Sequence, residues 1–208
     1  LEIATNAIDC IHTTAASHGR VFIVEIMGHK VGSITLNAGV AGGADVILIP
    51  EIPYDINKVA EAIQKRNKAG KRFTILAVAE GAISKEDAEL PKKKYKEKLA
   101  ERAKKYPSVS YEIADQIQQV TGSEVRITVP GHMQRGGEPC AYDRVLSTRI
   151  GAGAAQAIMD EEYGVMIGVI NGKIKRVPLA ECAGKLKMVS PKDQLVKAAK
   201  QIGISFGD

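Results

Sequence analysis

The residues best suited to chemistry form a turn at positions 130–137. This Gly-rich stretch carries His132 and Arg135, and it follows an apolar run that contains Arg126. A guanidinium group matches phosphate oxygens through two parallel hydrogen bonds, and an imidazole N–H adds a further donor. The combination therefore predicts a phosphate-binding turn, with a basic surface turn as the alternative interpretation.

Two further sites in the sequence carry residues that could bind a sugar or an anion. Residues 27–32 contain two glycines and precede a run of small residues, so free N–H groups at a helix N-terminus could receive an anion. Close packing is the alternative role of these glycines, and the stretch matches neither a Walker loop nor Gly-x-Gly-x-x-Gly. Glu80, at the end of another apolar run, could accept hydrogen bonds from sugar hydroxyls; a solvated loop carboxylate is its alternative interpretation.

Each of these groups follows a predicted strand, and predicted strands and helices alternate along the chain. Apolar, β-branched runs predict strands, and periodic apolar positions predict helices. Expected strands cover residues 21–26, 46–50, 73–79 and 124–129, followed by a hairpin around Asn171 and Gly172. Expected helices cover residues 3–16, 33–41, 55–69, 110–120, 141–159 and 191–202. The alternation predicts an α/β fold of three layers, a largely parallel sheet with helices on both faces, whose ligands bind beyond the carboxyl ends of the strands.

Composition narrows the classes of function. Among 208 residues, 45% are hydrophobic and 25% charged, which argues against disorder. A net charge of +5 suits anionic ligands, but without a recognition motif, and with 4% aromatic residues, it does not indicate nucleic acid. Three scattered cysteines predict neither a disulfide framework nor a zinc site. No apolar run suits a membrane span and no signal peptide is apparent, so we expect a cytoplasmic protein. Because residue 1 is Leu, we expect a piece of a larger protein.

A basic, helix-forming stretch at about residues 84–110 interrupts this pattern. It contains Lys92, Lys93, Lys94, Lys96 and Lys98. We interpret it as an inserted helix with a solvated basic face. A nucleic-acid-binding helix is the alternative interpretation, which predicts steeply salt-dependent binding to any duplex.

The motif around the first turn resembles the 6-phosphofructokinase family. The resemblance rests on Gly-His-x-Gln-Arg-Gly-Gly at residues 131–137, followed by Pro139 and Asp143-Arg144. Two further blocks follow the family's order, at residues 24–32 and at residues 41–51. The resemblance covers the chain apart from the Lys-rich stretch, and it corresponds to the carboxyl-terminal half of the family's subunit. It implies one fructose 6-phosphate-binding α/β domain over residues 1–208, with the Lys-rich insertion and without the donor-binding half.

The resemblance implies a substrate site shared between subunits of a homo-oligomer. One subunit would hold the sugar and its 6-phosphate with Met27, Gly28, His29, Glu80, His132 and Arg135. The neighbouring subunit would reach the same phosphate with Arg20 and Arg126. In regulated members, allosteric effectors bind at positions that match Gly43, Asp45 and Lys71. His29 stands where the family usually has Arg, and a neutral imidazole offers a single donor.

The implied activity is phosphoryl transfer to the 1-hydroxyl of fructose 6-phosphate in glycolysis, from ATP or pyrophosphate with Mg²⁺. The Gly-rich donor loop and the Asp-containing catalytic segment of the family are absent from these residues. The resemblance therefore assigns no catalytic residue and no metal ligand here, and we expect the 208 residues alone to be inactive. A non-catalytic sugar-phosphate-binding or regulatory module is the alternative function.

Overall fold

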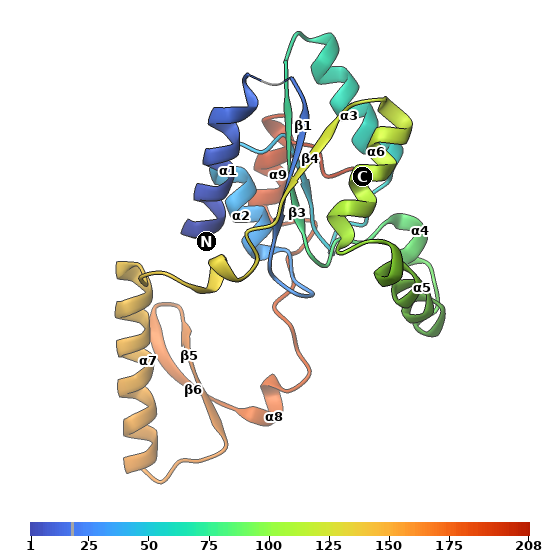
Figure 1. Cartoon of the computed structure of the whole chain (residues 1–208). Helices are drawn as coiled ribbons and strands as arrows, with labels where there is room; N and C mark the ends of the chain where they lie inside the picture. The colour runs from blue at the N-terminus through green and yellow to red at the C-terminus, as the bar shows by residue number, and fades with distance from the viewer. Residues whose placement is uncertain (18) are drawn as a thin grey trace. The chain divides into compact units, whose positions relative to one another are not determined.

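The structure, a computed structural model that describes residues 1–17 and 19–208, contains a four-stranded parallel sheet. The strand order is β2-β3-β1-β4, and all three pairings are parallel. The strands are β1 (Val21–Ile26), β2 (Val46–Leu48), β3 (Thr74–Ala79) and β4 (Val125–Thr128). Each lies within two residues of the strand expected from the sequence. Helices connect the strands, as parallel pairing requires (Figure 1).

Alternating side chains of the strands feed two separate hydrophobic clusters. On one face, Val24 and Ile75 pack with α1 (Glu2–Ala15), α2 (Ser33–Ala41) and α9 (Gln194–Gln201). On the other face, Ile23 and Leu76 pack with α3 (Ile56–Lys68) and α6 (Val109–Thr121). Because successive strand residues point to opposite faces, an uninterrupted apolar run fills both clusters. The expected three-layer α/β fold is confirmed.

Local signals place the ends of the helices. Asp55 accepts a hydrogen bond from the Asn57 amide at 2.8 Å and so caps α3, as its residue type predicts. Gly122 ends α6 in the left-handed region, with φ +68°. The buried Glu25 carboxylate of β1 accepts hydrogen bonds from Ser108 Oγ at 2.5 Å and from the Ser110 amide at 3.3 Å. A carboxylate at a helix N-terminus is stabilising, so these bonds tie the start of α6 to β1.

The described residues group into two compact units. The first comprises residues 1–135 and 188–208 and holds the sheet, its helices and the 3₁₀ turn η1 (Gly131–Arg135). The second, Gly136–Lys187, contains α7 (Ala141–Met159), α8 (Leu179–Cys182) and the antiparallel pair β5 (Val165–Ile170) and β6 (Lys173–Pro178). Positive φ angles at Asn171 and Gly172 fit the expected hairpin turn. That residues 1–208 act as one sugar-phosphate-binding domain stays a prediction.

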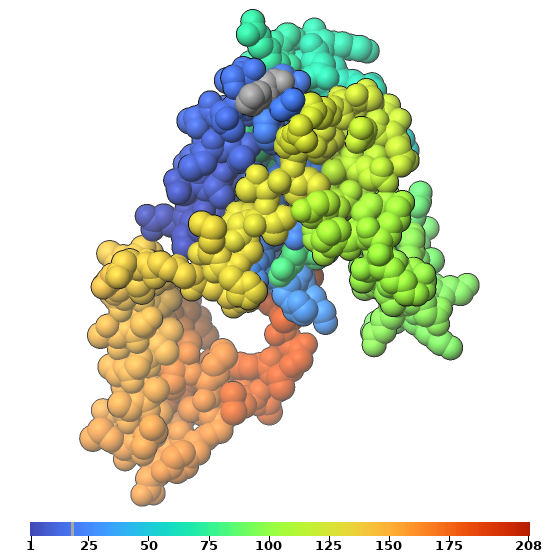
Figure 2. All heavy atoms as spheres, viewed as in Figure 1, coloured from blue at the N-terminus to red at the C-terminus, as the bar shows by residue number. Residues whose placement is uncertain are grey.

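The Lys-rich stretch forms two helices, α4 (Lys85–Ala88) and α5 (Lys92–Lys105), and α5 lies at the surface in Figure 2. One side of α5 is solvated, as expected. Its other side carries Lys98 and Arg102, which pair at 2.5 Å with the two oxygens of the fully buried Asp87 carboxylate. Arg102 also pairs with Glu112 of α6 at 2.6 Å. The expected solvated face is therefore only one side of this helix, because ion pairs with the buried Asp87 and with Glu112 hold the other side.

Replacing the four exposed lysines 92, 93, 94 and 96 together with glutamine is expected to leave thermal stability nearly unchanged. All four side chains are exposed, and single substitutions at such surface positions change stability by about 0.5 kcal/mol or less. Arg102→Gln is the contrasting variant, because it removes the pairs with Asp87 and Glu112. Thermal melting of the two variants tests this division of the helix. A loss in the lysine variant as large as that in Arg102→Gln would contradict it.

Candidate functional site

The loop at residues 27–32, between β1 and α2, is held by side chains from three other segments. Glu80 Oε1 accepts hydrogen bonds from the amides of Gly28 at 3.1 Å and His29 at 2.6 Å. Glu51 accepts from the Gly32 amide with both oxygens at 3.0 Å, and Gln134 Oε1 accepts from the Met27 amide at 3.2 Å. The expectation of free amides in this loop is therefore wrong for these four groups.

The backbone of the loop has a shape that depends on glycine. His29 has φ +52°, in the left-handed region that side-chain-bearing residues rarely adopt. A Cβ atom on Gly81 would stand 2.1 Å from the His29 carbonyl oxygen, and one on Gly28 would stand 2.5 Å from that of Val31. The loop therefore folds tightly against the Glu80–Gly81 turn. Its strained residue is His29, which stands where the family usually has Arg.

Gly81→Ala is expected to displace the loop and weaken any ligand binding that depends on it. The new methyl group would overlap backbone at His29, which cannot move aside as a flexible side chain can. Gly151→Ala is the matched control, because nothing lies within 4 Å of its Cβ position and alanine favours a helix. Thermal melting and ligand titration of both variants make the comparison. An unchanged Gly81→Ala variant would show that the close contact at His29 does not hold the loop.

The second component of the site is the turn η1, which follows β4. His132 and Arg135 are exposed on this turn, whereas Gln134 between them is half-buried. Gln134 Nε2 donates to the Gly131 carbonyl at 3.3 Å, and its Oε1 reaches the Met27 amide. The turn η1 and the loop after β1, far apart in the sequence, are therefore adjacent in the structure.

A hollow of about 370 Å³ lies where the two meet. Its size falls within the range usual for small-molecule sites. It is lined by Leu1, Ala4, Met27, Gly28, His29, Ile34, Gln134 and Arg135. No carboxylate stands among these lining residues, and the one guanidinium, from Arg135, favours an anionic ligand. The hollow brings together four of the residues expected at the substrate.

Glu80 and His132 are the two other residues expected from the same subunit, and neither lines the hollow. Glu80 lies behind the loop, where its Oε1 atom holds two amides. Its Oε2 atom has no hydrogen-bond partner among the described residues. Glu80 is therefore first a support of the loop, and only Oε2 remains for a sugar hydroxyl. His132 is exposed on the turn beside Gln134.

Arg20 and Arg126 lie at the opposite end of the sheet. Residue 21 pairs with residue 125, and both arginines form ion pairs with Glu124, Arg20 at 2.5 Å. Met27 follows Arg20 by seven residues along an extended strand, which separates them by about 20 Å. These arginines therefore cannot reach the hollow of their own chain. Their expected action in a neighbouring subunit stays a prediction.

The residues expected at an effector site surround the start of β2. Asp45 is largely buried: Oδ2 accepts from the Ile75 amide at 2.9 Å, and Oδ1 pairs with Arg66 at 2.8 Å. Burial raises the pKa of Asp45, although these two interactions oppose the effect. Gly43 is left-handed, with φ +71°, and Lys71 is exposed. Asp45 therefore joins α3 to β3, and effector binding at these residues stays a prediction.

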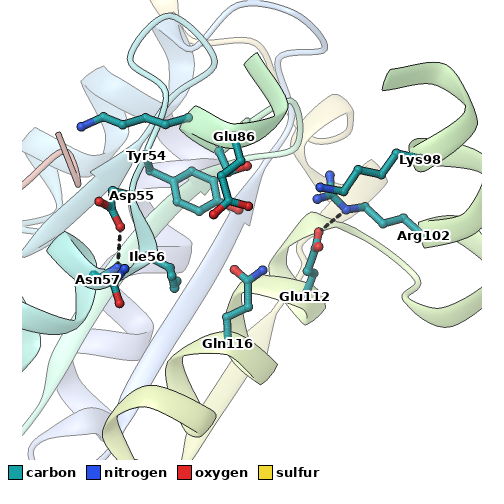
Figure 3. A pocket seen from close by; sticks show the side chains of 11 residues that line it. Tyr54, Asp55, Ile56, Asn57, Glu86, Lys98, Arg102, Glu112 and Gln116 are labelled. Carbon is teal, nitrogen blue, oxygen red and sulfur yellow. Dashed lines mark hydrogen bonds and ion pairs between the residues drawn. The ribbon is translucent and has the colours of Figure 1, made fainter. Parts of the chain in front are cut away.

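A second hollow of about 210 Å³ lies between the start of α3 and helices α5 and α6 (Figure 3). In Figure 3, Arg102 points at Glu112 and the two form an ion pair. Tyr54 lines the same hollow, and burial raises the pKa of its hydroxyl above the usual range, so it stays protonated. The cations Lys98 and Arg102 already have carboxylate partners. Lys85 also lines this hollow, but so do the carboxylates of Asp55, Glu86 and Glu112, which make it less suited to an anion than the first hollow.

Residues 1–17 and 19–208 hold neither a cluster of metal-binding side chains nor a helix that could span a membrane. No group of three or more His, Cys, Asp or Glu side chains there could hold a metal ion. Within the same residues, no helix is both long and apolar enough to cross a membrane.

Three supporting residues were missed by the sequence interpretation. Gln134 lies inside the motif, and Glu51 lies at the end of the second matching block, so both positions were marked without a role. Gly81 follows Glu80 directly. Their partners lie 107, 19 and 52 residues away, respectively, and such pairing has no local signal. For Gln134 and Glu51 the available signal was membership in a matching block, and for Gly81 it was the position directly after Glu80.

Comparison with known proteins agrees with the motif and the fold. The family model described as "Phosphofructokinase" matches residues 1–158. The ATP-dependent 6-phosphofructokinases of Spirochaeta thermophila and Chloroflexus aurantiacus are 46% and 47% identical to the whole chain, which covers 56% of each. The chain thus spans about half the length of these curated relatives.

Solved structures match the fold. The phosphofructokinase from Saccharomyces cerevisiae aligns with a TM-score of 0.69 and 34% identity, over 85% of this chain and 22% of that one. The pyrophosphate-dependent phosphofructokinase from Marinobacter aquaeolei aligns with a TM-score of 0.73 over 98% of this chain and 53% of that one. At 20% identity, the second likeness concerns the fold alone. Since the family model covers most of the chain and the same blocks build the hollow, the chain belongs to the phosphofructokinase family.

Proposed function

We propose that this chain is the fructose 6-phosphate-binding part of a 6-phosphofructokinase, which transfers a phosphoryl group to the 1-hydroxyl of the sugar. One observation carries the proposal: the loop at residues 27–32 and the turn η1 jointly line one hollow that has a guanidinium and no carboxylate. A sugar phosphate has a dianionic end, which suits the guanidinium of Arg135 and would be repelled by a carboxylate.

Each end of the substrate would meet a different element. The sugar would lie against Met27, Gly28 and His29, with Glu80 Oε2 available to a hydroxyl. The 6-phosphate would lie against Arg135 and His132, whose exposed side chains can turn towards it. Phosphoryl transfer depends mainly on positioning and charge stabilisation, and this chain's contribution is the positioning of the acceptor.

The remaining parts of the reaction would come from outside these residues. ATP is the donor named for the curated relatives, and pyrophosphate is the alternative; Mg²⁺ would accompany either donor. We assign no catalytic residue to this chain and expect it to bind substrate without turnover. Homo-oligomeric assembly and a cytoplasmic location belong to the same proposal. In an oligomer, a phosphate would compete with Glu124 for Arg20 and Arg126 of the adjoining subunit.

Calorimetric titration of the 208-residue chain with fructose 6-phosphate tests the proposal. We expect saturable binding, with fructose failing to bind because it lacks the charged end. Inorganic phosphate is the second comparison, and it should bind more weakly because it leaves the loop at residues 27–32 without contacts. Equal affinity for phosphate and fructose 6-phosphate would contradict a sugar site. Absence of binding in a folded sample would contradict the proposal for this chain.

A further inference from the structure

A single side chain joins the two halves of the candidate site. Gln134 Oε1 accepts a hydrogen bond from the Met27 amide at 3.2 Å, and its Nε2 donates to the Gly131 carbonyl at 3.3 Å. The first bond crosses 107 residues of sequence, and the second stays within η1. The amide therefore links the loop after β1 to the turn after β4.

The link needs an acceptor and a donor on one short, planar group. A carboxamide has both, a carboxylate at neutral pH has acceptors only, and an aliphatic side chain has neither. The partners also fix the orientation of this carboxamide, because an N–H faces one end and a carbonyl oxygen faces the other. Glutamine is thus the side chain whose chemistry matches both contacts.

The two neighbours that would bind phosphate have no such anchor. His132 and Arg135 are exposed, and among the described residues neither forms a hydrogen bond or an ion pair with another side chain. Their positions relative to Met27, Gly28 and His29 therefore depend on how η1 is attached to the loop. Gln134, half-buried between them, makes the hydrogen-bonded attachment.

We propose that Gln134 is a positioning residue that fixes the spacing between the sugar-binding loop and the phosphate-binding turn, which rests on the function proposed above. Gln134 lines the hollow, but its two hydrogen-bonding ends are already engaged with backbone. It therefore acts through the two elements that it joins. A substrate with both a sugar and a phosphate depends on this spacing, whereas a ligand with one of the two does not.

Two variants of Gln134 separate the chemistry of the link from its bulk. Gln134→Leu keeps the size and removes both hydrogen bonds. Gln134→Glu keeps the acceptor for the Met27 amide and loses the donor to Gly131 at neutral pH. Each lost bond corresponds to about a tenfold change in affinity, so both variants should bind fructose 6-phosphate about 10-fold or more weakly at pH 7.5.

The pH dependence of binding distinguishes positioning from a merely structural role. A protonated glutamic acid regains a donor, and the ordinary pKa of Glu is about 4.3. The affinity of Gln134→Glu, relative to the wild-type chain at the same pH, should therefore begin to rise as the pH falls to 5 and approach the wild-type value only below about pH 4.3. Gln134→Leu has no proton to gain and should show a constant deficit. Met133→Ala, in the same turn and 73% exposed, is the matched control and should bind as the wild type does.

Amide hydrogen exchange tests the link without any ligand. In the wild-type chain the Met27 amide should exchange slowly, and in Gln134→Leu at least 10-fold faster, while Met133→Ala leaves it unchanged. Unchanged Met27 exchange in Gln134→Leu, or wild-type affinity for fructose 6-phosphate in that variant, would overturn the positioning proposal. Faster exchange together with a wild-type chain that does not bind the sugar phosphate would overturn the proposed function and leave the link standing.

Discussion

Replacing Arg135 with alanine is expected to weaken fructose 6-phosphate binding by about 10- to 100-fold and to leave thermal stability unchanged. A hydrogen bond to a charged group contributes about 1.5–3 kcal/mol, and the net loss of one such bond corresponds to roughly a 10- to 100-fold change in affinity. Arg135 is exposed and, within the described residues, forms no hydrogen bond or ion pair. Its removal therefore costs the protein no contact of that kind.

Arg135→Lys sharpens the test of this prediction. Lysine keeps the positive charge and loses the fork that matches two phosphate oxygens, so its affinity should lie between those of the wild type and Arg135→Ala. Arg72→Ala is the matched control, because Arg72 is an exposed arginine that precedes β3 at the other end of the sheet. Calorimetric titration measures all four chains. Equal affinities in Arg135→Ala and Arg72→Ala would remove Arg135 from the site.

Asp87→Ala is expected to lower the free energy of unfolding by about 3 kcal/mol, the lower end of the range for removing one partner of a buried ion pair. The Asp87 side chain is fully buried and pairs with Lys98 and Arg102. Arg102 keeps its pair with Glu112 when Asp87 is removed, which places the loss at that lower end. Urea unfolding at pH 7 measures the difference. Glu86→Ala, an exposed carboxylate on the same short helix, is the matched control.

The contribution of Asp87 should depend on pH in a defined direction. Burial by itself raises the pKa of Asp87, but hydrogen bonds from Lys98 and Arg102, with their charges, outweigh it and hold the pKa below 3.8. The folded state therefore favours the charged form. The stabilisation is complete well above pH 4 and is lost as the pH falls through the folded-state pKa. The difference between wild type and Asp87→Ala should shrink below pH 4. A difference that grows in acid would contradict the ion-pair account.

Much of the fold was predictable because its signals are local. The β-branched run at residues 21–26 forms a strand that is buried on both faces. Asn171 and Gly172 adopt the left-handed angles of a tight turn. Asp55 caps a helix through a contact two residues away. Each of these depends on neighbours in the sequence, so composition and spacing indicate them directly.

The supports of the candidate site were not predictable in the same way. Glu80 was expected at the sugar as a ligand, yet one of its oxygens holds the amides of Gly28 and His29 across 52 and 51 residues. The Lys-rich helix was expected on a solvated face, yet Arg102 reaches two carboxylates that only tertiary packing brings to it. Motif residues identified the loop and the turn, and the long-range partners that fix them required the fold.

Mapping the bound sugar phosphate by amide chemical shifts is the measurement that tests the account most directly. On adding fructose 6-phosphate to the 208-residue chain, we expect the amides of Met27, Gly28 and His29 to shift together with those of His132 and Arg135, at one common affinity. The Arg135→Ala variant should lose both sets of shifts together. Shifts confined to the Lys-rich helix α5, or to the hollow beside Tyr54, would contradict a site shared by the loop and the turn.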